Sequence, residues 1–260
     1  MNTPQVEFVD VDGTNIAVRR QEGDAPGVMW LGGYKSDMLG TKAEALAEWA
    51  TGQGRAFLRH DYSGHGESGG EFADGTISKW LRESLAVFAR HTRGPQVLVG
   101  SSMGGWIALR MVQELLKAGE SRVRGLVLIA PAPDFTAELV EPAMTEEQRR
   151  ELAQQGYFEI PSDYVDEPYI YTRNLIEDGR ANLMMSAPID THCPVHILQG
   201  MQDESVPHSH ALKLASLLPA DDVTLSLVPD GDHRLSRPQD IELLISAVRD
   251  MAAQASRQNT

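Results

Sequence analysis

A serine, an aspartate and a histidine occur in this sequence in the order and context that nucleophilic acyl chemistry requires. Ser102 is the middle residue of Gly-Ser-Ser-Met-Gly at 100–104, which matches the pattern G-x-S-x-G. An apolar run at 97–99 precedes this motif, and a helical pattern follows it. A sharp turn from strand to helix lifts such a serine above a sheet and points the helix N-terminus at the reacting oxygen. Ser102 is the candidate nucleophile, and the alternative is a glycine-rich turn that only packs a helix on a strand.

The candidate general base is His233. It lies just after the apolar run 223–228 and before a terminal helical pattern that begins at Pro238. Loops at the carboxyl ends of strands are where ligand chemistry collects in open α/β sheets. The other histidines precede Ser102, end a helix or flank the strand pattern at 195–198, and those positions are more typical of structural or exposed histidines.

Asp203 is the candidate acid. It follows the strand pattern at 195–198 and gives the chain order serine, aspartate, histidine. Its carboxylate would fix the tautomer of the imidazole and stabilise the imidazolium. Two other carboxylates remain alternatives: the adjacent Glu204, and Asp134 after the preceding strand pattern.

Two backbone amides are candidates for an oxyanion hole. Tyr34 follows Gly32-Gly33 at the end of an apolar strand pattern, and Met103 follows the nucleophile. Their N–H groups would converge on the developing oxyanion. The alternative for residues 32–34 is a simple turn between a strand and a helix.

The elements that must position these residues alternate between strands and helices. Asp12-Gly13 lies between two alternating runs and predicts a hairpin. Helical patterns at 41–51, 77–92, 103–118 and 208–218 separate bare apolar runs, such as Leu126–Ala130. This alternation predicts a doubly wound, mostly parallel sheet.

One stretch interrupts this alternation. Residues 134–190 are longer than a single crossover helix needs, so we expect a core made of 1–133 and 191–260 with 134–190 inserted as a helical cap. Apolar side chains of the cap are expected to line an acyl pocket above the serine, and methionine would adapt to varied substrates. These candidate substrate-binding residues are Tyr157, Phe158, Leu183, Met184 and Met185.

Two cationic residues flank the candidate site in sequence. Lys35 follows the proposed oxyanion loop, and Arg234 follows His233. Both are candidates to bind a leaving group that carries a carboxylate. The alternative is that both are exposed surface charges.

Composition limits the classes of partner. The 260 residues carry 37 acidic and 23 basic side chains, a formal net charge of −14, which should repel nucleic acids and anionic lipid surfaces. No apolar run is long enough to span a membrane. With one cysteine, Cys193, and no H-E-x-x-H motif, neither a disulfide, a metal nor a cofactor is expected. The N-terminus shows no signal-peptide pattern, so we expect a cytoplasmic monomer or homodimer.

Several motifs together resemble the α/β-hydrolase-domain proteins, in particular a mitochondrial member described as an acyl-glucuronide esterase and palmitoyl-protein thioesterase. They lie at residues 33–38, 61–64, 99–106 and 232–234, and the likeness runs over nearly the whole chain. The resemblance implies the α/β-hydrolase fold and a triad of Ser102, Asp203 and His233. Because this sequence lacks the transit segment of the mitochondrial protein, we expect a bacterial member.

The residues and the resemblance together predict a serine hydrolase that cleaves small-molecule carboxylic esters or thioesters through an acyl-enzyme. A cofactor-free perhydrolase or a C–C hydrolase could use the same triad. From another class, a ligand receptor could retain the pocket and turn over slowly. Haloalkane dehalogenases and epoxide hydrolases are disfavoured because they carry an aspartate where Ser102 stands.

Overall fold

The computed structural model describes residues 5–161, 168–218 and 222–257. One eight-stranded sheet forms the core, with strand order β1-β2-β4-β3-β5-β6-β9-β10. Its strands are β1 (Glu7–Val11), β2 (Thr14–Gln21), β3 (Asp24–Leu31), β4 (Arg55–His60), β5 (Gln96–Ser101), β6 (Val123–Ile129), β9 (Val195–Gly200) and β10 (Val223–Val228). From β4 to β10 all neighbours are parallel, whereas β1 pairs with β2 and β2 with β4 in antiparallel fashion.

The antiparallel edge confirms the hairpin that was predicted from Asp12-Gly13. Both residues have positive φ angles, 52° and 81°, and Val11 pairs with Thr14 across the turn. Two central turn residues with positive φ match the twist of the flanking strands. The hairpin therefore forms one edge of the sheet, and the candidate site residues follow the parallel strands.

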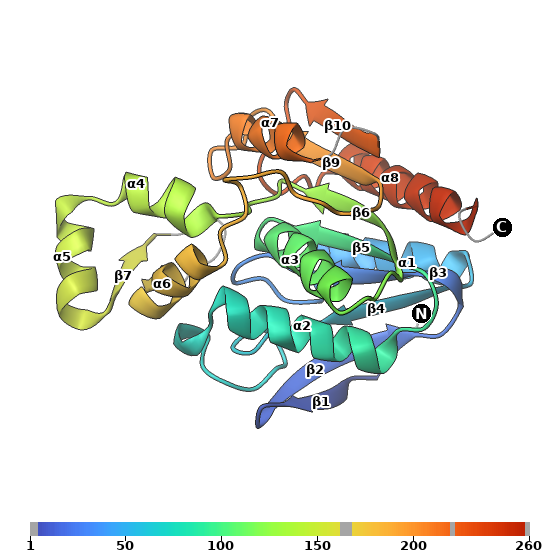
Figure 1. Cartoon of the computed structure of the whole chain (residues 1–260), viewed down its shortest axis with the longest axis horizontal. Helices are drawn as coiled ribbons and strands as arrows, with labels where there is room; N and C mark the ends of the chain where they lie inside the picture. The colour runs from blue at the N-terminus through green and yellow to red at the C-terminus, as the bar shows by residue number, and fades with distance from the viewer. Residues whose placement is uncertain (1–4, 162–167, 219–221, 258–260) are drawn as a thin grey trace.

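Helices cover both faces of the sheet (Figure 1). Side chains of α1 (Thr41–Gly52) and α8 (Pro238–Arg257) belong to one buried apolar cluster. Side chains of α2 (Ile77–His91), α3 (Met103–Lys117) and α7 (His208–Leu217) belong to a second, larger cluster. The predicted doubly wound sheet is confirmed, because parallel strands buried on both faces require helices on both sides.

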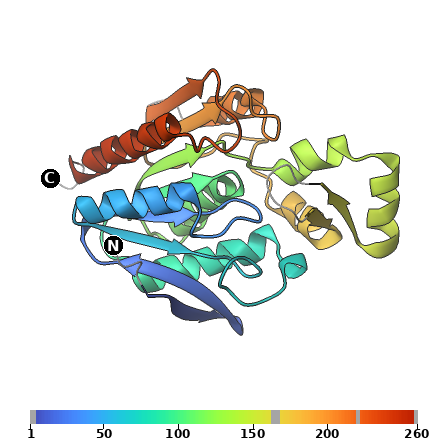
Figure 2. The ribbon, with the colours of Figure 1, turned by 180° about the vertical axis from the view of Figure 1, so that it is seen from behind.

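A long insertion separates β6 from β9, and we call residues 134–190 the inserted segment. Its elements are η2 (Thr136–Val140), α4 (Glu141–Ala143), α5 (Glu146–Gln155), β7 (Tyr157–Ile160), β8 (Tyr169–Thr172) and α6 (Arg173–Ala181). Strands β7 and β8 form a separate antiparallel pair. Figures 1 and 2 show α4, α5, β7 and α6 grouped beside the core rather than on the faces of the sheet. A short helix of the core, η1 (Phe72–Asp74), contacts β8.

Asp134 ties the two ends of the inserted segment together. Its buried carboxylate accepts the backbone N–H groups of Met184 at 3.0 Å and of Met185 at 2.7 Å. Burial raises the pKa of this carboxyl above its ordinary value, and the two N–H donors oppose that shift. Asp134 therefore fixes the backbone at the point where the inserted segment rejoins the core. The sequence pattern did not indicate this structural role.

Candidate active site

Ser102 lies in a strained turn between β5 and α3. Its φ of 53° and ψ of −117° lie in a region that side-chain-bearing residues rarely adopt. Two glycines make the turn possible, because a Cβ on Gly100 would lie 2.4 Å from the Gly104 carbonyl oxygen, and one on Gly104 would lie 2.1 Å from the Leu31 carbonyl oxygen. The G-x-S-x-G pattern is therefore a packing requirement of this turn.

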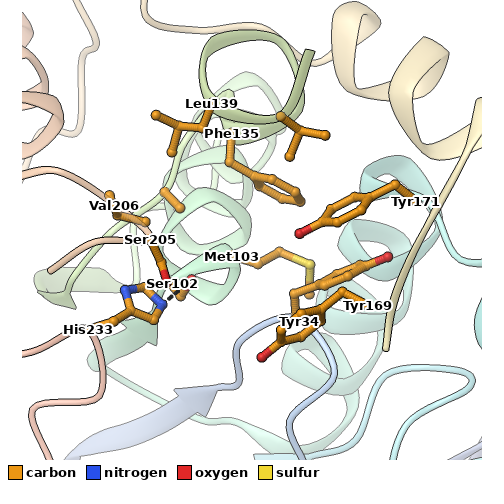
Figure 3. A pocket seen from close by; sticks show the side chains of 12 residues that line it. Tyr34, Ser102, Met103, Phe135, Leu139, Tyr169, Tyr171, Ser205, Val206 and His233 are labelled. Carbon is orange, nitrogen blue, oxygen red and sulfur yellow. Dashed lines mark hydrogen bonds between the residues drawn. The ribbon is translucent and has the colours of Figure 1, made fainter. Parts of the chain in front are cut away.

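The structure brings Ser102, His233 and Asp203 into one hydrogen-bonded chain. Figure 3 shows the contact between Ser102 and His233. The imidazole Nε2 of His233 lies 3.2 Å from Ser102 Oγ, and its Nδ1 lies 2.8 Å from Asp203 Oδ2. The three residues follow β5, β10 and β9, so their side chains meet at the carboxyl ends of parallel strands. A base within hydrogen-bond reach of a hydroxyl, itself oriented by a carboxylate, is the geometry of an activated nucleophile.

The carboxylate of Asp203 is buried and accepts several hydrogen bonds. Its Oδ1 accepts the backbone N–H groups of Ser205 at 2.9 Å and Val206 at 2.7 Å. Its Oδ2 accepts the side-chain amide of Gln199 at 3.1 Å in addition to the His233 ring. The rotamer of Asp203 is thus fixed from both sides. Neither alternative acid reaches His233 in this way, because Asp134 binds the inserted segment and Glu204 is exposed.

The backbone amides of Tyr34 and Met103 are unoccupied donors. Within the described part of the chain, neither N–H group donates a hydrogen bond to a protein acceptor. Met103 begins α3, so its N–H lies in the first turn, where helical amides have no intrahelical acceptor. The Tyr34 loop lies against the nucleophile, since a Cβ on Gly33 would stand 3.5 Å from Ser102 Cβ. Both amides are placed beside Ser102 and are free to bind an oxyanion.

His65 supports the loop that carries the Tyr34 amide, a contact that the sequence did not predict. The Lys35 backbone N–H donates to His65 Nε2 at 3.1 Å, and His65 Nδ1 lies 3.1 Å from the Ser63 carbonyl oxygen. Because a carbonyl only accepts, the proton of the neutral ring is on Nδ1. Burial lowers the pKa of His65 to about 4, so the ring stays neutral near pH 7 and keeps accepting from Lys35.

An apolar cavity of about 130 Å³ opens on one side of the triad (Figure 3). Ser102 and His233 lie on its wall, as does the side chain of Met103. Most other lining residues are aromatic or aliphatic and come from the inserted segment and from the loop after β9: Phe135, Leu139, Val140, Tyr169, Tyr171 and Val206. We call this space the apolar cavity.

A second cavity of about 180 Å³ opens from the same serine and histidine and has a different chemical character. Three cationic residues line it: Lys35, Lys42 and Arg234. Lys42 donates to the Arg234 carbonyl and to Ser236 Oγ, and burial, with a smaller contribution from the Arg234 charge, lowers its pKa to about 8. We call this space the polar cavity. Its three cations outnumber the one carboxylate on its wall, that of Asp37, and so favour an anionic or strongly polar group.

The inserted-segment residues that we expected at the acyl pocket do not line the apolar cavity. Tyr157 and Leu183 are exposed, at 39% and 44% of their surface. Phe158, Met184 and Met185 are buried in the larger apolar cluster of the core and do not line the cavity. The β7–β8 pairing accounts for Tyr157, whose side chain lies on the outer face of that pair while Phe158 points inward.

The aromatic residues that do line the cavity were missed as site residues. Tyr169 and Tyr171 lie two apart on β8, so their side chains share one face of the strand. That alternation, Tyr-Ile-Tyr, was the signal available in the sequence. Phe135 and Leu139 have a helical spacing just after β6. No motif next to them in the sequence distinguishes them from ordinary core residues.

The described residues hold no cluster of three or more His, Cys, Asp or Glu side chains able to bind a metal ion. Cys193 lies away from both cavities, and burial raises the pKa of its thiol to about 12, which makes it a poor nucleophile. No described helix has the length and apolar character needed to cross a membrane.

Comparison with known proteins agrees with this architecture. A sequence profile of the alpha/beta hydrolase family matches residues 26–242. The crystal structure of a putative hydrolase from Agrobacterium vitis S4 is 54% identical, with a TM-score of 0.92, over 95% of this chain and 98% of its own. The structure of alpha/beta hydrolase domain-containing protein 10 from mouse is 34% identical, with a TM-score of 0.86, over 95% and 98% of the two chains.

Sequence comparison finds the same relative. A mouse protein named palmitoyl-protein thioesterase ABHD10, mitochondrial, is 37% identical over 238 residues, which are 91% of this chain and 78% of that protein. The human protein of the same name is 33% identical over 91% of this chain and 76% of its own. These matches confirm the resemblance and the fold expected from the motifs around Ser102 and His233, and they show that this chain belongs to the alpha/beta hydrolase family.

Proposed function

We propose that this protein hydrolyses carboxylic ester or thioester bonds through an acyl-enzyme on Ser102. The observation that carries the proposal is the hydrogen-bonded chain from Ser102 through His233 to the buried Asp203. The names of the mammalian relatives, which describe a palmitoyl-protein thioesterase, support this bond class.

The reaction proceeds in two steps. Ser102 Oγ attacks the carbonyl carbon while His233 Nε2 takes its proton, and the Tyr34 and Met103 amides bind the oxyanion. His233 then returns that proton to the departing alcohol or thiol, and Ser102 remains acylated. In the second step water gives its proton to His233 and attacks the acyl carbon, and His233 reprotonates Ser102 as the acid leaves. Asp203 keeps the Nδ1 proton in place throughout.

Each cavity takes one side of the scissile bond in this proposal. The apolar cavity receives the acyl group, because Phe135, Leu139 and Val206 offer no partner to a charged group. The polar cavity receives the leaving group, because Lys35 and Arg234 lie on its wall. The inserted segment, residues 134–190, acts as a cap that completes the acyl side.

We also propose that the activity is cytoplasmic and that the protein is a monomer or a homodimer. The single cysteine, Cys193, fits a compartment in which thiols stay reduced.

Pre-steady-state kinetics test the proposed function. After rapid mixing with a 4-nitrophenyl ester, we expect a burst of nitrophenol close to one equivalent of enzyme if deacylation is the slower step, followed by steady release. The steady rate after the burst also separates an enzyme from a slow-turnover receptor, which would release one equivalent and then very little more. A folded protein that releases neither an alcohol from esters nor a thiol from thioesters would contradict the proposal.

The cationic side of the polar cavity leads to a prediction about leaving groups. We expect Arg234→Gln to lower kcat/KM several-fold for an ester whose leaving group carries a carboxylate, mainly by raising KM, because the anion loses a nearby cation. For a neutral ester of the same acyl group, the change should be small. The measurement is kcat/KM for both esters at two salt concentrations, since added salt should weaken only the anionic preference.

A matched control is Arg249→Gln, on the exposed surface of α8 and outside both cavities. It should leave both esters unchanged. Equal weakening of both esters by Arg234→Gln would refute the anion-binding role of this residue and leave the acyl chemistry untouched.

A further inference from the structure

The apolar cavity has a size that limits which acyl group can enter. Its volume of about 130 Å³ is close to the roughly 150 Å³ of an engineered apolar protein cavity that binds benzene. A palmitoyl chain has more than twice as many carbon atoms as a benzene ring. The space beside Ser102 therefore matches a compact acyl group, and it can surround only part of a long chain.

Buried aromatic contacts fix two of the side chains that line the cavity, Phe135 and Tyr171. Phe135 meets the fully buried Trp106 edge to face, with ring centroids 5.6 Å apart. Trp106 is fixed in turn by a hydrogen bond from its indole N–H to the Asn182 carbonyl. Tyr171 stacks on the buried Phe158, with centroids 5.4 Å apart. Enlarging the cavity at these two walls would require breaking these contacts, so its width there is set by close packing.

The aromatic walls of the cavity are packed against one another. Tyr34 stacks on Tyr171, with ring centroids 5.5 Å apart, and Phe135 is tilted against Tyr34, with centroids 5.8 Å apart. All three rings also line the cavity. Because aromatic rings prefer offset-stacked and edge-to-face partners, the parts of these rings that border the cavity favour a planar aromatic acyl group over a flexible alkyl chain.

One polar atom projects into this aromatic space. The hydroxyl of Tyr171 points toward Phe135 and the interior of the cavity (Figure 3), and no hydrogen-bond acceptor for it is found among the described residues. Burial raises the pKa of Tyr171 to about 12, so the hydroxyl stays protonated and can donate. Tyr171 is half-buried and lines the cavity, so its hydroxyl is accessible from the cavity and can donate to a ligand that supplies an acceptor.

We propose, building on the function proposed above, that the acyl site selects compact aromatic acyl groups over long alkyl chains, and that Tyr171 binds a polar substituent on the ring. The substrate class is then an ester or thioester of an arenecarboxylic acid, with a hydroxyl-bearing ring preferred.

A panel of 4-nitrophenyl esters tests this inference. Acetyl, butanoyl, octanoyl, dodecanoyl, benzoyl and 4-hydroxybenzoyl esters are compared by kcat/KM, each divided by its rate of hydrolysis by hydroxide. We expect the corrected value for benzoyl to exceed those for octanoyl and dodecanoyl by about tenfold or more, since misfit in a tight pocket costs that much. The 4-hydroxybenzoyl ester should be the best of the panel.

Two variants test the walls. Tyr171→Phe keeps the ring and removes the hydroxyl, so the advantage of 4-hydroxybenzoyl over benzoyl should fall by about threefold to tenfold while benzoyl hydrolysis persists. Leu139→Ala enlarges the cavity and should raise the relative rate of the octanoyl ester. Leu212→Ala, at an exposed position of α7 away from both cavities, is the matched control and should not change the chain-length profile.

The outcomes separate this inference from the function on which it rests. Corrected rates that are equal for benzoyl and dodecanoyl, or that favour dodecanoyl, overturn the acyl selectivity while the Ser102 chemistry stands. An unchanged 4-hydroxybenzoyl preference in Tyr171→Phe overturns the role of that hydroxyl. A folded protein that hydrolyses no member of the panel overturns both proposals.

Discussion

Replacing Ser102 by alanine should lower kcat by about 10⁶-fold, as removal of an activated serine nucleophile does in other triad enzymes. The loss should be chemical rather than structural. Although Ser102 precedes the first residue of α3, its side chain makes no capping hydrogen bond, so its removal costs the helix little. The measurement is steady-state kcat together with the midpoint of thermal unfolding, and we expect the second to change little.

The neighbouring serine supplies the control for this variant. Ser101 ends β5 and forms no hydrogen bond with His233, so Ser101→Ala should cost far less activity. If Ser101→Ala caused the larger loss, the turn would present the other hydroxyl, and the assignment of the nucleophile would be wrong.

Asp203→Asn should lower kcat by up to about 10⁴-fold, the cost of a wrong imidazole tautomer in a comparable triad. The hydrogen bonds explain why asparagine cannot compensate. On the Oδ1 side, the backbone N–H groups of Ser205 and Val206 require an acceptor, so the amide oxygen must face them. The amide nitrogen then faces His233 Nδ1, so Nδ1 must accept a hydrogen bond and the ring proton moves to Nε2. A protonated Nε2 cannot take the proton of Ser102.

Gln199 does not favour this exchange either. Its side-chain nitrogen donates to Asp203 Oδ2 at 3.1 Å and also to the carbonyl oxygens of Gly200 and Val206, each at 3.0 Å. The amide is therefore held in this orientation and presents a donor, not an acceptor, to the new asparagine NH₂ group. We expect Asp203→Asn to lose activity and some stability, as measured by kcat and by thermal unfolding followed by circular dichroism.

The two other carboxylates serve as controls for the acid. Glu204→Gln changes an exposed side chain and should have little effect on kcat. Asp134→Asn should act mainly on stability, because its carboxylate accepts the Met184 and Met185 amides and does not touch His233. A loss of activity concentrated at Asp134, with the protein still folded, would move the acid to the strand before the insertion.

The sequence predicted the core well because its signals are local. The G-x-S-x-G turn needs glycine at 100 and 104 for steric reasons that hold within a few residues. The Asp12-Gly13 turn likewise sets its own hairpin. Parallel strands buried on both faces are continuous apolar runs, which a sequence displays directly. For these reasons the alternation of strands and helices, and the positions of Ser102, Asp203 and His233 just after their strands, could be predicted from pattern, whereas the order of the strands in the sheet could not.

The inserted segment was predicted poorly because its arrangement depends on distant partners. Whether Tyr157 or Phe158 faces inward is set by the register of β7 against β8, and a shift by one residue would exchange them. Met184 and Met185 are drawn into the core by Asp134, which is 50 residues earlier for Met184 and 51 for Met185. The cavity walls at Tyr169 and Tyr171 come from a strand too short to predict from composition.

Covalent labelling tests the central claim most directly. The intact protein is treated with a fluorophosphonate, which reacts with activated serine hydroxyls, and the modified residue is identified by peptide mass spectrometry. We predict one phosphonyl adduct, on Ser102, absent from Ser102→Ala and formed much more slowly in Asp203→Asn. An adduct on Ser101 or another residue, or a folded protein that does not react, would contradict a nucleophile at Ser102 activated by His233 and Asp203.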